Sequence, residues 1–121
     1  MPIRSYRDLQ VWQKGVELSL QCYRLSRAFP SDERFGLTSQ IRRASVSIPS
    51  NIAEGHGRWT KGEYRNSLSS ASGSLAELET QLIIVRKLDY ASRAELESAD
   101  ELCDAVSRML TNLRRRLREG A

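Results

Sequence analysis

Arginines gather at two places in this chain. Arg42 and Arg43 are adjacent, and four of the five residues from 114 to 118 are arginine. A guanidinium group keeps its charge at physiological pH and donates paired hydrogen bonds to a phosphate or a carboxylate. The residues that we expect to contact nucleic-acid phosphates are Arg42, Arg43, Arg58, Lys61, Arg65, Arg114, Arg115, Arg116 and Arg118.

Each cluster also has a simpler interpretation. On a helix, Arg43 shares a polar face with Glu54 and two serines, where it either lies in solvent or pairs with an acidic residue of another helix. The segment 93–118 is acidic at its start and basic at its end, an order that the helix dipole favours by itself. Four arginines nevertheless exceed what the dipole requires, and repetition in an oligomer would strengthen the patch.

The composition is basic and offers little for catalysis. The chain has 121 residues, 19 of them basic and 15 acidic, for a net charge of +4 that suits an anionic partner. Cys22, Cys103 and the single histidine, His56, are too scattered for a zinc site. The sequence has no glycine-rich phosphate loop and no paired serine and base. We therefore expect no metal, no cofactor and no enzymatic activity.

The sequence has no targeting or membrane signal. No secretory signal precedes the first helical pattern. No apolar run approaches the roughly 20 residues that span a membrane. We expect a bacterial cytoplasmic protein without a membrane partner.

Apolar residues recur at helical spacing in four segments, and none shows strand-like alternation. The predicted helices span residues 7–28, 33–55, 61–88 and 93–118. The stripe of the first helix consists of Leu9, Trp12, Val16, Leu20 and Tyr23, with Val11 and Leu18 beside it. Short connections require consecutive helices to run antiparallel. The sequence therefore predicts one all-α domain over residues 1–121, an up-down-up-down four-helix bundle with left-handed packing.

Two patterns bear on self-association. Ser67, Ser70 and Ser74 form a stripe of small residues that either packs within the monomer or meets another protomer. Four apolar residues also lie off the main stripes, as in a wide core or in an oligomer. These are Leu18, Leu37, Val46 and Leu102.

The segment QIRRASVSIPSNIAEGHG combines a helical pattern with an internal proline. Pro49 lacks a backbone donor and crowds the carbonyl four residues back, so we expect a kink. Asn51, Glu54 and Gly55 then end the helix. We interpret Pro49, Asn51, Glu54 and Gly55 as a structural motif, with a binding role for Asn51 and Glu54 as the second interpretation.

The residues after this motif have partners close in sequence. Arg58 lies four residues after Glu54, the spacing of a helical ion pair. Trp59 either covers the helix junction before Thr60 as a hydrophobic staple or stacks on a base beside Arg58 and Lys61.

The run RRASVSIPSNIAEG resembles the signature of the bacterial four-helix-bundle family whose founding members are encoded in intervening sequences of 23S ribosomal RNA genes. The blocks YRDLQVWQKGVEL, TKGEYRNSLSSASGSLAELETQL and KLDY resemble further family blocks in the same order, so the likeness covers roughly residues 6–117. The resemblance implies a ring-shaped homo-pentamer. It also implies a link to RNA, since related pentameric bundles are accessory proteins of reverse transcriptases in diversity-generating retroelements.

These observations lead to one functional hypothesis and one alternative. The hypothesis is a non-enzymatic, oligomeric bundle that binds RNA or DNA phosphates through an arginine-rich surface. The alternative is a protein-interaction or scaffold module that does not contact nucleic acid.

Overall fold

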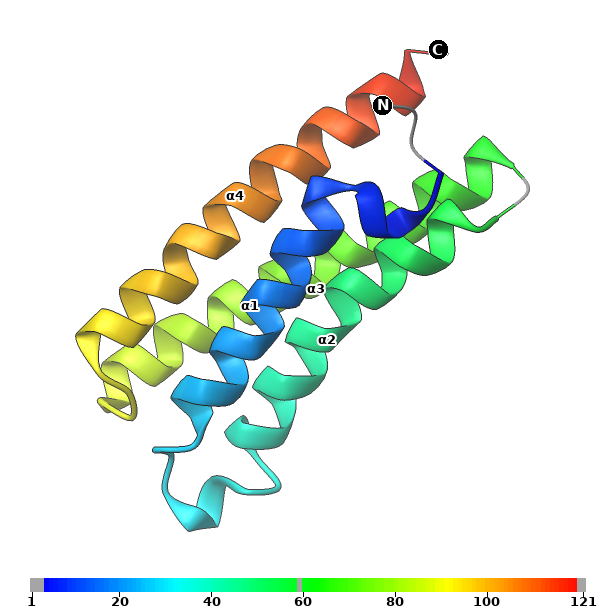
Figure 1. Cartoon of the computed structure of the whole chain (residues 1–121). Coiled ribbons are helices and arrows are strands. Elements are labelled where there is room, and N and C mark those ends of the chain that lie inside the picture. Colours follow the sequence, from blue (N-terminus) through cyan, green and yellow to red (C-terminus); the bar gives the residue numbers. More distant parts are fainter. Residues whose placement is uncertain (1–3, 59, 120–121) are drawn as a thin grey trace.

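Four α-helices run the length of the computed structural model, which describes residues 4–58 and 60–119. They are α1 (Gln10–Ser26), α2 (Leu37–His56), α3 (Lys61–Leu88) and α4 (Arg93–Arg118). Consecutive helices run in opposite directions (Figure 1). The start of α1, the α2–α3 connection and the end of α4 therefore lie at one end of the bundle. The predicted all-α four-helix bundle is confirmed, and its left-handed packing stays a prediction.

Local capping chemistry explains where the last two helices begin. The Thr60 hydroxyl oxygen accepts the backbone N–H of Glu63 at 3.1 Å, and the Ser92 hydroxyl oxygen accepts that of Glu95 at 3.2 Å. Each bond satisfies a donor that has no partner inside the first turn. As a result α3 and α4 occupy the ranges 61–88 and 93–118 that the sequence predicts. Asp89, with a left-handed φ of 60°, then ends α3.

The first two helices are shorter than the predicted ranges 7–28 and 33–55. Leu9 has an extended backbone, so the 3₁₀ turn Tyr6–Asp8 is separate from α1. The α1 helix then ends at Ser26, and Pro30 disfavours helix in Phe29, the residue before it. The backbone dihedral angles of Gly36 lie outside the helical region. This residue therefore separates the 3₁₀ turn Ser31–Glu33 from the start of α2 at Leu37.

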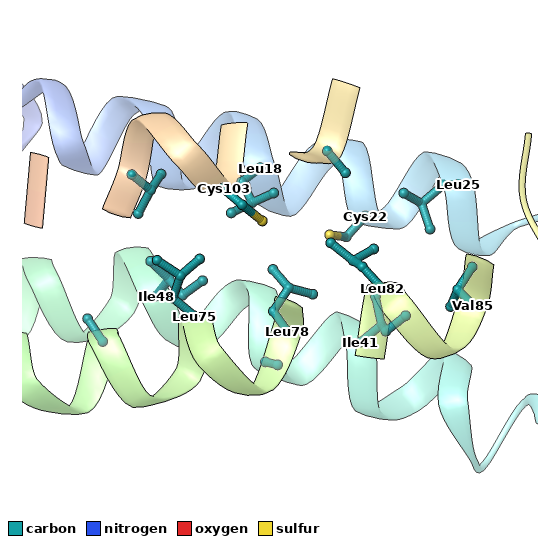
Figure 2. Packing of buried hydrophobic residues seen from close by; sticks show 14 of the residues in the cluster. Leu18, Cys22, Leu25, Ile41, Ile48, Leu75, Leu78, Leu82, Val85 and Cys103 are labelled. Carbon is teal, nitrogen blue, oxygen red and sulfur yellow. The ribbon is translucent and has the colours of Figure 1, made fainter. Parts of the chain in front are cut away.

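Apolar side chains from all four helices fill the interior of the bundle (Figure 2). Leu18, Cys22 and Leu25 of α1 meet residues of α2 and α3 such as Ile48 and Leu78. Burying this apolar area is the main stabilising contribution to the fold.

The α1 helix buries a stripe different from the predicted one. Leu18 is fully buried and Val11 nearly so, whereas Leu20 is 52% exposed and Tyr23 is 40% exposed. The predicted stripe is confirmed at Leu9 and Trp12, which pack against the core, and wrong at Leu20 and Tyr23. Its second half is out of phase because the buried residues Gly15 and Ser19 are not apolar and so interrupt the true stripe. Two of the four off-stripe residues therefore belong to a wide core: Leu18 and Leu37 are buried, while Leu102 is half-buried and Val46 is exposed.

Candidate nucleic-acid interface

Most of the predicted phosphate-binding residues lie at one end of the bundle, which we call the basic end. The α2–α3 connection and the first turns of α3 supply one part of it, and the last turns of α4 supply the other. Figure 1 shows these segments at the same end. The basic end consists of Arg58, Lys61, Arg65, Arg114, Arg115, Arg116 and Arg118, all with exposed side chains.

A contact between α3 and α4 positions these arginines. Arg114 Nη1 donates to Ser72 Oγ of α3 at 3.1 Å. Arg65 lies seven residues before Ser72, about two helical turns, so both residues share one face of α3. Burial raises the pKa of the Tyr64 hydroxyl, and the nearby charge of Arg116 partly opposes that rise. Arg65 and the α4 arginines therefore lie on neighbouring parts of one surface.

A groove of about 570 Å³ lies between the N-terminal turn and α4. Arg115 and Arg116 line it together with Asp8. Arg115 Nη2 donates to Asn112 Oδ1 at 3.2 Å, which orients the guanidinium group without neutralising it. The Asp8 carboxylate accepts the backbone N–H groups of Arg4 and Ser5 in a capping box. The groove thus presents two charged guanidinium groups beside one carboxylate that is already hydrogen-bonded.

Arg58 of the basic end is paired with carboxylates of this chain. It pairs with Glu54 as the spacing predicts, and its Nη1 also lies 3.9 Å from Glu63 Oε2. These carboxylates reduce the positive charge that Arg58 presents to an external phosphate. The neighbouring Trp59, for which the sequence leaves a staple and a stacking role open, is outside the described residues.

The structure does not bring Arg42 and Arg43 to the basic end. They lie near the start of α2, about 20 Å along the helix axis from Gly57 at a rise of about 1.5 Å per residue. Arg42 is half-buried: its guanidinium lies 4.7 Å from the centre of the Tyr23 ring. Its Nε also donates to Ser26 Oγ at 2.9 Å, so Arg42 joins α1 to α2.

The motif within α2 lies at contacts between helices. Pro49 is buried against α1, where a Cβ on Gly15 would lie 3.3 Å from the Pro49 Cβ. The Ser19 hydroxyl donates at 2.8 Å to the Ser45 carbonyl, which Pro49 leaves without its usual donor. These contacts give Pro49 a structural role, while the kink expected there stays a prediction.

Asn51 and Gly55 face α3. Asn51 Nδ2 donates to Ser47 O at 2.8 Å and to Ser47 Oγ at 3.0 Å, and Ser47 Oγ lies 2.7 Å from Ser74 Oγ. A Cβ on Gly55 would lie 2.5 Å from the Ser67 Cβ. Two members of the serine stripe therefore pack within the monomer, which supports the simpler interpretation of that stripe.

Sequence reasoning missed a second groove, of about 720 Å³, along the outer side of α1 and α2. It is lined by Arg42 and Arg43 together with Tyr23, Arg34 and Phe35. Phe35 is 87% exposed. The available signal was its position beside Arg34, because a large aromatic residue that belongs to no predicted apolar stripe has no predicted place in the core.

Within the residues that the structure describes, no three His, Cys, Asp or Glu side chains come together to hold a metal ion. In the same part of the chain, every helix is too short or too polar to cross a membrane.

Comparison with solved structures gives the same fold. A crystal structure at 1.70 Å resolution, of a protein with unknown function from the S23 ribosomal protein family of Bacteroides thetaiotaomicron VPI-5482, has a TM-score of 0.78. The two sequences are 23% identical, and the match covers 86% of this chain and 97% of that chain. Such an identity establishes the fold alone.

Comparison with sequence families gives an assignment for most of the chain. No curated protein matches it. The family model described as "23S rRNA-intervening sequence protein" matches residues 7–112, which include the RRASVSIPSNIAEG run. The chain therefore belongs to the family of 23S rRNA-intervening sequence proteins.

Proposed function

We propose that this protein binds the phosphate backbone of RNA or DNA through the basic end, as a homo-oligomer and without catalysis. The observation that carries the proposal is the gathering of exposed cations from α3, α4 and the α2–α3 connection at one end of the bundle. Contacts to phosphates carry no direct sequence information, so sequence preference should be weak.

The partners of the α4 arginines support this proposal. The side chains of Ser72 and Asn112 accept hydrogen bonds from Arg114 and Arg115. Both acceptors are neutral, so they restrict the guanidinium groups and leave the positive charge in place. Part of the ordering cost of binding a phosphate is therefore met before the ligand arrives.

The family description, 23S rRNA-intervening sequence protein, connects the family with 23S ribosomal RNA. This connection is a reason to test ribosomal RNA first, and it does not by itself give a mechanism. The number of copies in the oligomer is part of the proposal, with five as the number that the family resemblance implies.

Salt-dependent binding tests the proposal. Fluorescence anisotropy should show that the protein binds a labelled 23S RNA hairpin, and a DNA duplex of equal length, less tightly as salt rises from 50 to 300 mM. Each lost phosphate contact lowers the log–log slope by about 0.7–0.9. Replacing Arg115, Arg116 and Arg118 with Gln should therefore lower the slope by about 2–3 per copy.

The matched control removes three exposed arginines at the opposite end of the bundle. Arg24, Arg27 and Arg93, each replaced with Gln, change the net charge by the same amount. This control should keep the wild-type slope. Equal decreases of the slope in both triple variants would show that the effect depends only on net charge. Absence of salt-sensitive binding by the wild type would refute the proposal.

A scaffold role is the second candidate function. The observation that favours it is the groove beside α1 and α2, where the exposed apolar side chains of Tyr23, Phe35 and Val46 lie together. Scattered exposed apolar residues are normal, but a contiguous group marks a contact surface. Recovery of a defined protein partner after nuclease treatment, together with no binding to either nucleic acid, would favour this function.

A further inference from the structure

The groove of about 720 Å³ beside α1 and α2 differs from the basic end in the side chains that it presents. It extends to the α1–α2 connection, which Figure 1 shows at the end of the bundle opposite the α2–α3 connection. We call it the α1–α2 groove and define it by Tyr23, Arg34, Phe35, Arg42 and Arg43. Three of these residues are arginines, and no acidic residue lines the groove, so its occupant should carry negative charge.

The arginines of the α1–α2 groove keep their charge for an external anion. Arg34 and Arg43 have exposed side chains and make no hydrogen bond or ion pair within the described residues. Arg42 donates to the Ser26 hydroxyl, which is neutral. The groove at the basic end, by comparison, includes the carboxylate of Asp8. Two guanidinium groups of the α1–α2 groove are therefore available to bind phosphates.

Two aromatic rings lie beside these arginines. The Arg34 guanidinium is 5.2 Å from the centre of the Phe35 ring. The Arg42 guanidinium lies in the same way 4.7 Å from the centre of the Tyr23 ring. Phe35 is 87% exposed and Tyr23 is 40% exposed, so each ring keeps a surface that this chain does not cover. Aromatic rings and guanidinium planes both stack on nucleobases, so the groove can hold a base as well as a phosphate.

Hydroxyl groups complete the lining of the α1–α2 groove. Thr38 and Ser39 belong to the first turn of α2 and line the groove together with Tyr23. None of these three hydroxyls makes a hydrogen bond to another part of the chain that the structure describes. Each can donate one hydrogen bond and accept others, and a sugar hydroxyl or a base edge can supply the partner.

The exposed rings discriminate between paired and unpaired nucleic acid. A base inside a duplex has both faces covered by its neighbours in the stack, whereas an unpaired base can be splayed out onto an aromatic side chain. Proteins that bind single strands combine a positively charged groove with such rings. The α1–α2 groove has both features, whereas no aromatic residue lines the groove at the basic end.

We infer that the α1–α2 groove binds unpaired nucleotides of a single-stranded nucleic acid. A base stacks on the Phe35 ring, and the flanking phosphates meet Arg34 and Arg43. This inference goes beyond the proposed function, which requires only phosphate contacts at the basic end and does not distinguish single strands from duplexes. It gives the protein a second, separate site that selects unpaired bases.

Variants of Phe35 test the stacking. Fluorescence anisotropy gives the Kd for a labelled, unstructured RNA of 12 nucleotides and for a blunt RNA duplex of 12 base pairs. Phe35→Leu keeps an apolar side chain without a ring, so it should weaken the binding of the single strand at least about fivefold and leave duplex binding unchanged. Phe35→Trp keeps a ring and should retain the wild-type affinity. Because residue 35 is exposed, both variants should fold, as circular dichroism can check.

Salt dependence separates stacking from charge. Phe35→Leu should weaken single-stranded RNA by the same factor at every salt concentration and leave the log–log slope unchanged. Arg43→Gln should lower that slope by about 0.7, the value for one phosphate contact of a single strand. Ile83→Ala is the matched control, because it removes an exposed apolar side chain of α3 that does not line the groove. It should change neither the affinity nor the slope.

A variant without the α4 arginines isolates the α1–α2 groove. In the Gln triple variant of Arg115, Arg116 and Arg118, single strands should still bind more tightly than duplexes, and the preference should still depend on Phe35. If the triple variant has no preference for single strands, the inference is wrong. If the wild type does not bind the duplex but its binding of single strands depends on Phe35, the proposed function fails and this inference stands.

Photocrosslinking locates the stacked base. RNA that contains 5-iodouridine forms a covalent bond on irradiation with an aromatic side chain that stacks on the modified base, and mass spectrometry identifies the residue. We expect the crosslink at Phe35 or Tyr23. Crosslinks confined to the basic end, or an unchanged affinity of Phe35→Leu for single-stranded RNA, would overturn the inference.

Other occupants of the α1–α2 groove give different results. Equal competition by adenosine 5′-monophosphate at the same phosphate concentration would assign the groove to free nucleotides. A changed solution mass of Phe35→Leu in light-scattering chromatography would assign the ring to a contact between copies. Loss of a protein partner by Phe35→Leu, with RNA binding unchanged, would assign it to a scaffold role. Each of these results would overturn the inference.

Discussion

The hydroxyl of Ser19 on α1 donates a hydrogen bond of 2.8 Å to the carbonyl oxygen of Ser45 on α2. That carbonyl is the one that an N–H at position 49 would normally satisfy, and position 49 is a proline. Both serines are buried, so water is not there to replace the missing donor. The α1 helix thus supplies the hydrogen bond that the sequence of α2 removes.

Ser19→Ala should lower the free energy of unfolding by about 1–3 kcal/mol, the cost of a buried carbonyl without a donor. Urea unfolding followed by circular dichroism at a fixed protein concentration measures this change. Ser98→Ala, on the exposed surface of α4, is the control and should change stability by less than about 0.5 kcal/mol.

The same bond can be tested for its dependence on the proline. Pro49→Ala restores an N–H to α2, so Ser19→Ala should cost less in that background. A double-mutant cycle measures the difference. Identical costs in the two backgrounds would show that the Ser19 hydroxyl does not compensate for Pro49.

Gly55→Ala should destabilise the protein by about 1–3 kcal/mol, because the added methyl group would lie 2.5 Å from the Ser67 Cβ and force α2 and α3 apart. Gly73→Ala is the matched control. Its added Cβ meets no atom within 4 Å, so helix propensity should make it stabilising by up to about 1 kcal/mol. Thermal unfolding of both variants gives the comparison, and a stabilised Gly55→Ala would contradict the close approach.

Arg42→Gln should reduce stability by about 1–2 kcal/mol, since it removes the contact with the Tyr23 ring and the hydrogen bond to Ser26. Arg43→Gln, one residue away and exposed, should change stability by less than about 0.5 kcal/mol at protein concentrations where the chain is monomeric. Urea unfolding of the two variants side by side measures both values. Equal effects would refute the distinct positions of these neighbouring arginines.

Stability should fall as the pH rises above about 9. Burial raises the pKa of the Cys22 thiol from the ordinary 9.0 to about 12, and burial also raises the pKa of Cys103. Because the unfolded chain loses these protons at lower pH than the folded chain, stability is complete below pH 9 and declines between about 9 and 12. Urea unfolding at pH 8 and pH 10 measures the loss.

A Cys22→Ala, Cys103→Ala double variant is the control for that pH dependence. It should be less stable at pH 8 because it leaves space in the core. Its stability should nevertheless decline less than that of the wild type between pH 8 and pH 10. An unchanged decline would assign the effect to other groups.

The sequence predicts the parts of this fold that depend on local chemistry. Thr60 and Ser92 cap α3 and α4 where the sequence predicts that these helices begin, and the apolar residues at helical spacing that follow form their buried faces. The pairing of Glu54 with Arg58 was also predictable, since the two residues are four apart in sequence, the spacing of a helical ion pair.

The parts that the sequence did not predict depend on contacts between helices. The true stripe of α1 contains Gly15 and Ser19, which are small or polar because Pro49 and its unsatisfied carbonyl lie opposite. A search for apolar periodicity passes over such positions. Arg42 and Arg43 are likewise equivalent in sequence, and only the position of Tyr23 on the neighbouring helix separates a held guanidinium from an exposed one.

The arrangement of the chain has a practical consequence for any binding assay. Arg4 and Glu119, the first and last described residues, lie at the same end of the bundle as the α4 arginines (Figure 1). Arg4 even bonds to the carboxylate that lines the groove with Arg115. An affinity tag fused to either terminus would therefore begin beside the surface under test, and a histidine tag could itself attract or shield nucleic acid. Cleavage of the tag before measurement, or its insertion in the α3–α4 connection at the far end, keeps that surface clear.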